Sequence, residues 1–283
     1  MIITELAPAK LNLTLEIGQK RPDGYHDLVS IMTCAGLYDT VTVEETGDGC
    51  IAVTCDDAAL PCDESNLAWR AASVFFDAAN MVCPGVRIHL QKKIPMQAGL
   101  GGGSADAAAV LRALRNLYAP EVATETLEEL GAELGSDVPF CVRGGTARCE
   151  GRGEKMETLP DMLNCWYVIV KPREAHPTGA MYGAIDRLNP IRRHTTVQMT
   201  VALTAGDLNA MAENLYNTFE DVLPESSEIP AIRALLLRCG ALGAMMSGSG
   251  SAVFGLFADQ AAAQAAYETA CKRWPRTFLA QSV

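Results

Sequence analysis

The sequence predicts an α+β fold in two domains, each built from a mixed or antiparallel sheet packed with helices. The 283 residues correspond to about two domains at ~150 residues per domain. Stretches with the period of a strand and stretches with the period of a helix occur in both halves, without the regular alternation of a parallel sheet. We expect an N-terminal domain over residues 1–155 and a C-terminal domain over residues 156–283.

Alternating apolar and polar residues mark the first predicted strand. Its apolar side chains are Leu11, Leu13, Leu15 and Ile17. A period of two places Lys10 and Asn12 together on the face opposite the core. Two further alternating runs, at residues 41–43 and 51–55, flank the turn residues 47–49, and this pattern predicts a β-hairpin.

Helices are predicted on both sides of a glycine-rich stretch. Residues 66–80 carry apolar side chains at helical spacing. Ser104 is placed as the N-cap of an alanine-rich helix that follows the glycines. The residues Thr126–Glu129 form a capping box that opens another helix, which Gly135 ends.

The second half of the chain continues this mixture. Residues 165–170 form an apolar run that is typical of a buried strand, and three helical stretches follow it. A unit of strand, glycine loop and strand is predicted at residues 243–257. A helix at residues 259–274 and a closing strand complete the chain.

The charge balance excludes two kinds of partner. The chain carries 23 basic and 34 acidic side chains, which gives a net charge of −11. Nucleic-acid surfaces and polybasic membrane anchors need a basic face, so neither partner is expected. The apolar runs are also far shorter than the ~20 residues that cross a bilayer.

The cysteines indicate a reducing compartment. Ten cysteines occur without one CxxC pair, so their spacing fits neither a zinc site nor a dithiol redox motif. The first residues lack the basic and apolar regions of a signal peptide. We therefore expect reduced thiols and a cytoplasmic protein.

The segment Pro95–Ala108 carries the strongest chemical signal. Its four glycines lie directly before a predicted helix. Such glycines turn consecutive N–H groups toward one point, and the helix adds the positive end of its dipole, so the segment is typical of a phosphate cradle. No lysine follows as in a Walker A loop, and Ser104 stands where a dinucleotide fingerprint needs its third glycine. Ser104 and the alternating N-terminal strands disfavour a dinucleotide-dependent oxidoreductase.

Three segments in order resemble one superfamily of small-molecule kinases. Pro95–Ala108 resembles the phosphate-binding motif of the galactokinase, homoserine kinase, mevalonate kinase and phosphomevalonate kinase (GHMP) superfamily, Ala7–Leu13 its first motif and Met246–Phe254 its third. Lys20–Leu28 and Gly135–Phe140 are similar to segments of the members that phosphorylate a cytidine diphosphate alcohol in the non-mevalonate isoprenoid pathway. The resemblance implies a two-domain fold in which the C-terminal domain completes the substrate cleft.

The resemblance also implies a reaction and its catalytic residues. The γ-phosphate of ATP would pass to a hydroxyl group of the substrate, with Mg²⁺ accompanying the ATP. Asp137 would act as the base, and Lys10 would assist it and neutralise charge on the phosphoryl group. The residues implied to bind ATP are Pro95, Gly99, Leu100, Gly101, Gly102, Gly103 and Ser104. The sequence does not identify the Mg²⁺ ligands, although Ser104 is a candidate.

Further residues are implied to hold the substrate and to support the phosphate loop. The substrate would contact Asn12, Tyr25, His26, Thr178 and Tyr182, with an aromatic ring stacked on the cytosine. The phosphate loop would be supported by Ser247, Gly248, Ser249 and Gly250. The partners expected are therefore ATP and a small cytidine diphosphate alcohol, in a monomer or weak homodimer.

Two alternatives remain open. A kinase of the same superfamily that acts on homoserine or mevalonate would leave Gly24, Tyr25 and His26 without a role. A non-catalytic ligand sensor of the same fold is disfavoured because both Lys10 and Asp137 are present.

Overall fold

The computed structural model describes residues 1–190 and 193–283, which form two compact units. The first unit consists of Met1–Ala9, Tyr38–Met96 and Gly101–Gly144, and the second of Lys10–Leu37, Gln97–Leu100 and Gly145–Val283. The long strands β1 (Ile2–Lys20) and β2 (His26–Glu45) therefore contribute to both units. Both units contain strands and helices, one sheet is mixed and the other antiparallel, and the predicted α+β class is confirmed.

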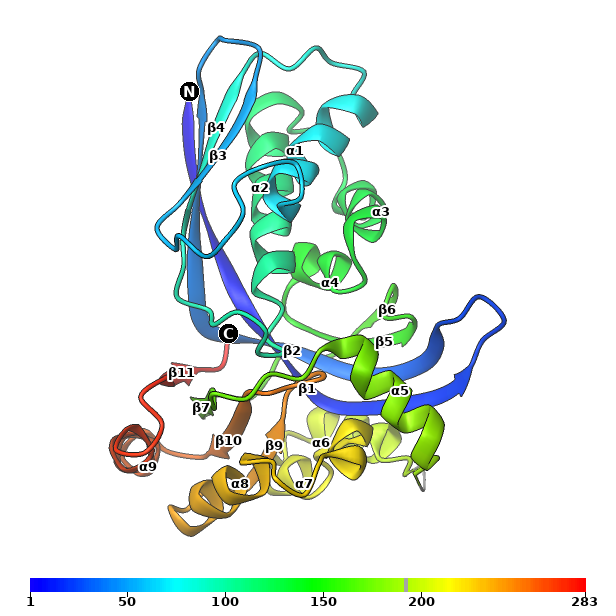
Figure 1. Ribbon diagram of the computed structural model, residues 1–283, viewed down its shortest axis with the longest axis vertical. Coiled ribbons are helices and arrows are strands. Elements are labelled where there is room, and N and C mark those ends of the chain that lie inside the picture. Colours follow the sequence, from blue (N-terminus) through cyan, green and yellow to red (C-terminus); the bar gives the residue numbers. More distant parts are fainter. Residues whose placement is uncertain (191–192) are drawn as a thin grey trace. The chain divides into compact units, whose positions relative to one another are not determined.

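The first unit packs four helices on one face of its strands (Figure 1). Strand β4 (Val86–Gln91) pairs antiparallel with Thr40–Glu45 of β2 and parallel with β3 (Ile51–Cys55). The hairpin predicted around residues 47–49 is therefore wrong, because β4 takes the position next to β2. The helices are α1 (Leu67–Ala78), α2 (Gly102–Tyr118), α3 (Thr124–Leu134) and α4 (Val138–Arg143).

Two helices, α2 and α3, begin at earlier residues than the sequence predicted. Gly101 is the N-cap of α2, and its left-handed φ of 70° makes the turn into the helix. Gly102 and Gly103 are therefore already helical. Ser104 lies inside the first turn and is not the N-cap that the sequence predicted. Helix α3 begins two residues before Thr126 and ends before Gly135, as expected. The alanines of α2 are buried, and their small side chains let α1 approach closely.

The second unit contains a four-stranded antiparallel sheet. Its order is β11–β7–β10–β9, with bounds Thr277–Gln281, Trp166–Val170, Val253–Phe257 and Gly243–Met246. The predicted buried strand, the strand–loop–strand unit and the closing strand are thus confirmed. Helices α8 (Ile229–Arg238) and α9 (Gln260–Cys271) pack on this sheet and bury apolar side chains such as Leu236 and Ala266.

The rest of the second unit packs around residues 10–37, which include the parts of β1 and β2 that belong to this unit. Residues Leu28–Thr33 of β2 pair with β5 (Thr146–Gly151), which continues to β6 (Lys155–Thr158). The two-residue strand β8 (Tyr216–Asn217) pairs with β1. Between β7 and β9, the described chain forms one helix more than predicted: α5 (Thr178–Leu188), α6 (Thr196–Ala205), α7 (Leu208–Glu213) and α8, besides the 3₁₀ helix η1 (Thr218–Val222).

Two expectations from composition can be compared with the structure. All ten cysteines are free thiols in the structure, and four of them are buried. Among residues 1–190 and 193–283, no helix has the length and apolar character needed to cross a bilayer.

Candidate active site

The polar face of β1 is buried, although the sequence pattern predicts it on the side opposite the core. Lys10 is 4% exposed, Asn12 1% and Thr14 0%, and Glu16 at the end of the same face is also buried. A buried polar group costs free energy unless it is hydrogen-bonded. Each of these four side chains must therefore have partners, and those partners define the candidate site.

Lys10 and Asn12 form a fixed pair. The Lys10 Nζ donates to Asn12 Oδ1 at 2.6 Å, and Asn12 Nδ2 donates to Ser30 Oγ at 2.8 Å. Ser30 Oγ in turn donates to the Thr14 carbonyl at 2.6 Å. Because every group of the asparagine amide has a partner, the ammonium group of Lys10 is held in one position.

The two glycine-rich loops of the second unit touch each other. Ser247 Oγ donates to the Gly99 carbonyl at 2.9 Å, and the Ala252 N–H donates to the Ala98 carbonyl at 3.0 Å. A Cβ on Gly99 would lie 2.0 Å from the Ser247 carbonyl oxygen, and one on Gly248 would lie 3.0 Å from the Gly99 carbonyl oxygen and 3.3 Å from Lys10 Nζ. Both positions require glycine because the backbones approach so closely.

The outer part of the 247–251 loop has its own contacts. Asn217 Nδ2 donates to the carbonyls of Met246 and Gly248, each at 2.8 Å. Thr178 and Ser249 share a hydroxyl hydrogen bond of 2.9 Å. Gly250 has a φ of 88°. The structure thus places Thr178 beside the third motif, at the start of α5.

The first unit holds the start of α2 and Asp137. The Ala105 N–H makes the first bond of α2, to the Gly101 carbonyl at 2.8 Å, so the N–H groups of Gly102, Gly103 and Ser104 precede the helical ladder. Such groups can bind a phosphate. Pro95 lies buried before this loop. Asp137 is half-buried at the N-cap of α4, and its carboxylate does not cap that helix.

A buried charged cluster of the first unit was missed in the sequence. Lys92 contacts both Asp39 and Asp106, and Asp39 also accepts the Ile94 N–H at 2.8 Å. The cluster ties the segment before Pro95 to α2. Burial and, to a lesser degree, the neighbouring Asp39 raise the pKa of Asp106 to about 7, against the opposing effect of Lys92. The only local sign of this cluster in the sequence was that Lys92 and Asp106 flank the glycines.

The predicted base-binding residues fall into two groups. His26 is buried and stacks on Tyr182 with ring centroids 4.9 Å apart and planes at 20°. Tyr25 is 54% exposed, and its ring is covered by the Arg152 guanidinium at 5.0 Å. His26 also contacts Asp186 of α5, which the sequence did not single out.

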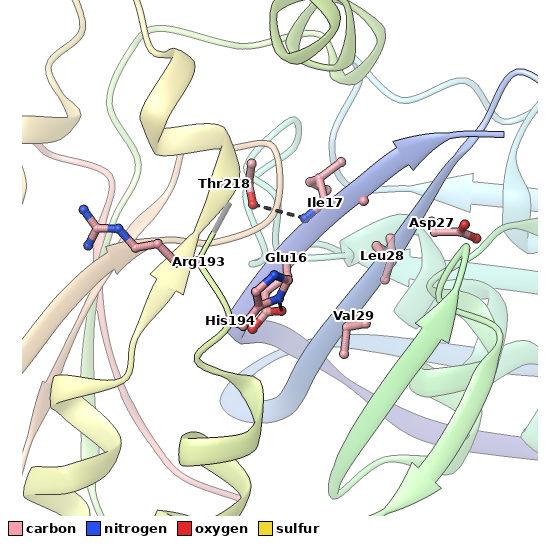
Figure 2. Close-up of a pocket in the computed structure, with 9 residues that line it drawn as sticks. Glu16, Ile17, Asp27, Leu28, Val29, Arg193, His194 and Thr218 are labelled. Carbon is pink, nitrogen blue, oxygen red and sulfur yellow. Dashed lines mark hydrogen bonds and ion pairs between the residues drawn. The ribbon is translucent and has the colours of Figure 1, made fainter. Parts of the chain in front are cut away.

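A cavity of about 220 Å³ lies at the far end of the polar face of β1. Glu16, His194 and Thr218 line it, together with Leu28 of β2 (Figure 2). Glu16 Oε1 accepts the N–H groups of Thr195 and Thr196 at 2.7 Å each, so the carboxylate stabilises the start of α6. The cavity contains none of the predicted site residues, and we assign its lining a structural role.

Metal ligands are sparse in the described residues. Residues 1–190 and 193–283 contain no cluster of three or more histidine, cysteine, aspartate or glutamate side chains suited to a metal. Ser104, the candidate Mg²⁺ ligand expected from the sequence, lies in the first turn of α2.

The sequence and the fold of this chain correspond to a known class of kinases. Residues 66–145 match the GHMP kinases N terminal domain, and residues 199–276 match the GHMP kinases C terminal domain. The crystal structure of a homoserine kinase from Cytophaga hutchinsonii aligns with a TM-score of 0.77, over 100% of this chain and 94% of that one. Its sequence is 19% identical, so this similarity supports the fold alone.

Several relatives of higher identity are named as one kinase. Proteins named 4-diphosphocytidyl-2-C-methyl-D-erythritol kinase are 45% identical in Exiguobacterium sibiricum, over 94% of this chain and 93% of that one, and 39% identical in Clostridium botulinum, over 98% and 99%. A crystal structure of 4-(cytidine 5'-diphospho)-2C-methyl-D-erythritol kinase matches with a TM-score of 0.84 and 35% identity, over 99% and 98%. The chain belongs to this family of kinases within the GHMP superfamily.

The contact between the two glycine loops gives a direct test. Gly99→Ala should lower the melting temperature and the affinity for ATP, because the new Cβ overlaps the Ser247 carbonyl and the φ of 73° is itself unfavourable by about 1–2 kcal/mol for alanine. Gly240→Ala is the matched control, since its φ is 93° and no atom lies within 4 Å of the added Cβ. Equal losses of melting temperature in the two variants would contradict the overlap.

The raised pKa of Asp106 predicts a pH dependence of stability. Between about pH 4 and pH 7 the unfolded chain has released a proton that the folded chain retains, so the wild-type free energy of unfolding should fall as pH rises. Asp106→Asn cannot ionise. Its free energy of unfolding, measured by urea titration relative to wild type, should therefore increase across this range and level off above it.

Asp77 is exposed on α1, and the variant Asp77→Asn is the control for removing one carboxylate from the surface. A difference between Asp106→Asn and wild type that stays constant from pH 4 to pH 8 would show that Asp106 ionises normally in the folded protein.

Proposed function

We propose that this protein transfers the γ-phosphate of ATP to the 2-hydroxyl of 4-diphosphocytidyl-2-C-methyl-D-erythritol. The observation that carries the proposal is the identity of 39–45%, over nearly the full chain, with kinases named for this substrate. In the reaction, the hydroxyl oxygen forms a bond to the γ-phosphorus while the bond from that phosphorus to the bridging oxygen breaks. The products are the phosphorylated alcohol and ADP.

The chemical step depends on charge and position. Phosphoryl transfer passes through a loose transition state, so the enzyme contributes mainly orientation and electrostatic stabilisation. Asp137 would orient the hydroxyl and accept its proton. Lys10 would stabilise the charge on the transferring group. The hydrogen bond to Asn12 supports this role, because it fixes the ammonium group without removing its charge.

ATP would be held mainly by backbone. The N–H groups of Gly102, Gly103 and Ser104 at the start of α2 suit the phosphates. Gly99 and Leu100 would position the loop, which Ser247 and Gly248 support through the contacts described above. Mg²⁺ would neutralise phosphate charge when bound, and the Ser104 hydroxyl could reach it as a ligand.

The cytosine would be recognised by aromatic rings and by a histidine edge. Tyr182 and Tyr25 offer faces for stacking, an interaction worth about 1–3 kcal/mol per base. His26 offers a ring nitrogen to the edge of the base. The stack of His26 on Tyr182 supports this role, because it holds the imidazole plane at a fixed angle.

A coupled assay of ADP release tests the substrate. We expect turnover with the cytidine diphosphate alcohol and at least about a hundredfold lower kcat/KM with homoserine, mevalonate or the same alcohol phosphate without its cytidine, because stacking and edge contacts would be lost. Comparable rates with homoserine or mevalonate would instead favour a sister kinase. Absence of ADP release with all substrates would favour a sensor.

The catalytic roles are tested by Lys10→Ala and Asp137→Asn. Each should lower kcat by at least about a thousandfold while the dissociation constant for ATP, measured by calorimetry, changes less than about threefold. Lys155→Ala, on the exposed strand β6, is the matched lysine control and should keep normal turnover. Near-normal kcat in either site variant would remove that residue from the mechanism.

A further inference from the structure

Three charged or titratable side chains form a chain beside the predicted base site. Asp186 lies in α5. Its Oδ1 is 2.7 Å from Nε2 of His26, and its Oδ2 is 2.8 Å from Nζ of Lys20. The two strands that carry Lys20 and His26 are joined by the loop of Tyr25. One carboxylate thus connects the end of β1, the start of β2 and α5.

The protonation of this chain follows from its donors. The hydrogen bonds from Lys20 and, secondarily, from His26 lower the pKa of Asp186, so the group is a carboxylate at neutral pH and can only accept. The proton between Asp186 and His26 must then lie on Nε2. In the neutral imidazole ring the other nitrogen, Nδ1, is consequently an acceptor.

The plane of the His26 ring is also fixed. Its face stacks on Tyr182, whose ring packs edge-on against Phe219 at 5.1 Å. Within the described residues Nδ1 makes no hydrogen bond, and the side chain is 4% exposed. His26 therefore presents one acceptor atom whose direction is set by Tyr182 and Asp186.

We propose that Asp186 is a positioning residue that makes the base site select cytosine over uracil. The inference rests on the proposed function, and it adds a residue that acts only through His26. Cytosine carries an amino group at position 4, which can donate to Nδ1. Uracil carries a carbonyl oxygen there, whose lone pairs would face the lone pair of Nδ1, so the ring held in this tautomer disfavours it.

The tautomer can be observed without any substrate. We expect the ¹⁵N shifts of the wild-type enzyme at pH 8 to show the His26 proton on Nε2 and an unprotonated Nδ1, with the signals assigned by their loss in His26→Gln. In Asp186→Ala the two shifts should move toward each other as both tautomers become populated. A wild-type ring protonated on Nδ1 would overturn the inference.

Selectivity is measured with a matched pair of substrates, the cytidine diphosphate alcohol and its uridine diphosphate analogue. In Asp186→Ala we expect the ratio of their kcat/KM values to fall at least about tenfold, through a higher KM for the cytidine substrate, with its kcat within about twofold of wild type. Glu157→Ala is the control, because that exposed acid has a distant arginine partner, Arg148 at 3.9 Å. It should keep the wild-type ratio.

The outcomes separate the two proposals. A wild-type enzyme that does not use the cytidine substrate overturns the proposed function. An active wild type whose Asp186→Ala variant keeps the same ratio overturns the role of Asp186 and leaves the proposed function standing. A lower kcat with an unchanged ratio would likewise overturn base selection, since it would show a general structural effect.

Discussion

Much of the second unit depends on one constraint, the burial of the polar face of β1. The side chains of Asn12, Thr14 and Glu16 can be buried only with partners, and each partner fixes another segment. Asn12 binds Ser30 of β2, Thr14 binds Thr196, and Glu16 binds the N–H groups that open α6. The backbone of Asn12 also donates to Ser247 Oγ at 3.4 Å. The strand that carries the candidate catalytic lysine is therefore held by its polar side chains as well as by its apolar ones.

A hydrogen bond that orients a charged or polar group occurs at both predicted ends of the substrate site. At the phosphate end, Asn12 orients the ammonium group of Lys10. At the base end, Asp186 orients the imidazole of His26. In both cases a hydrogen bond with a neighbouring side chain fixes the direction of the group that would contact the ligand. Positioning of this kind lowers the entropy that must be lost when a ligand binds.

Local signals in the sequence located the glycine loops, most helices and the strands of the C-terminal sheet, because these depend on spacing and glycine content. The family followed from motifs in order. Long-range partners could not be predicted: β4 displaced the expected hairpin, Lys92 meets Asp39 from 53 residues away, and His26 meets Asp186 from 160 residues away. Ser104 was misplaced as a cap because the left-handed turn at Gly101 starts the helix earlier. The roles of Lys10 and Asp137 remain predictions.

Strands β1 and β2 have partners far along the sequence, which has a consequence for synthesis of the chain. Leu28–Thr33 pair with residues 146–151, and Ile17 binds Thr218, 201 residues further on. A ribosome must therefore complete most of the protein before these inner segments are covered. Polar side chains that alternate with apolar ones disfavour association of a strand with other chains, so we expect those of β1 to protect the unfinished strand until then. The polar side chains that are buried in the folded protein would thus also protect the nascent chain.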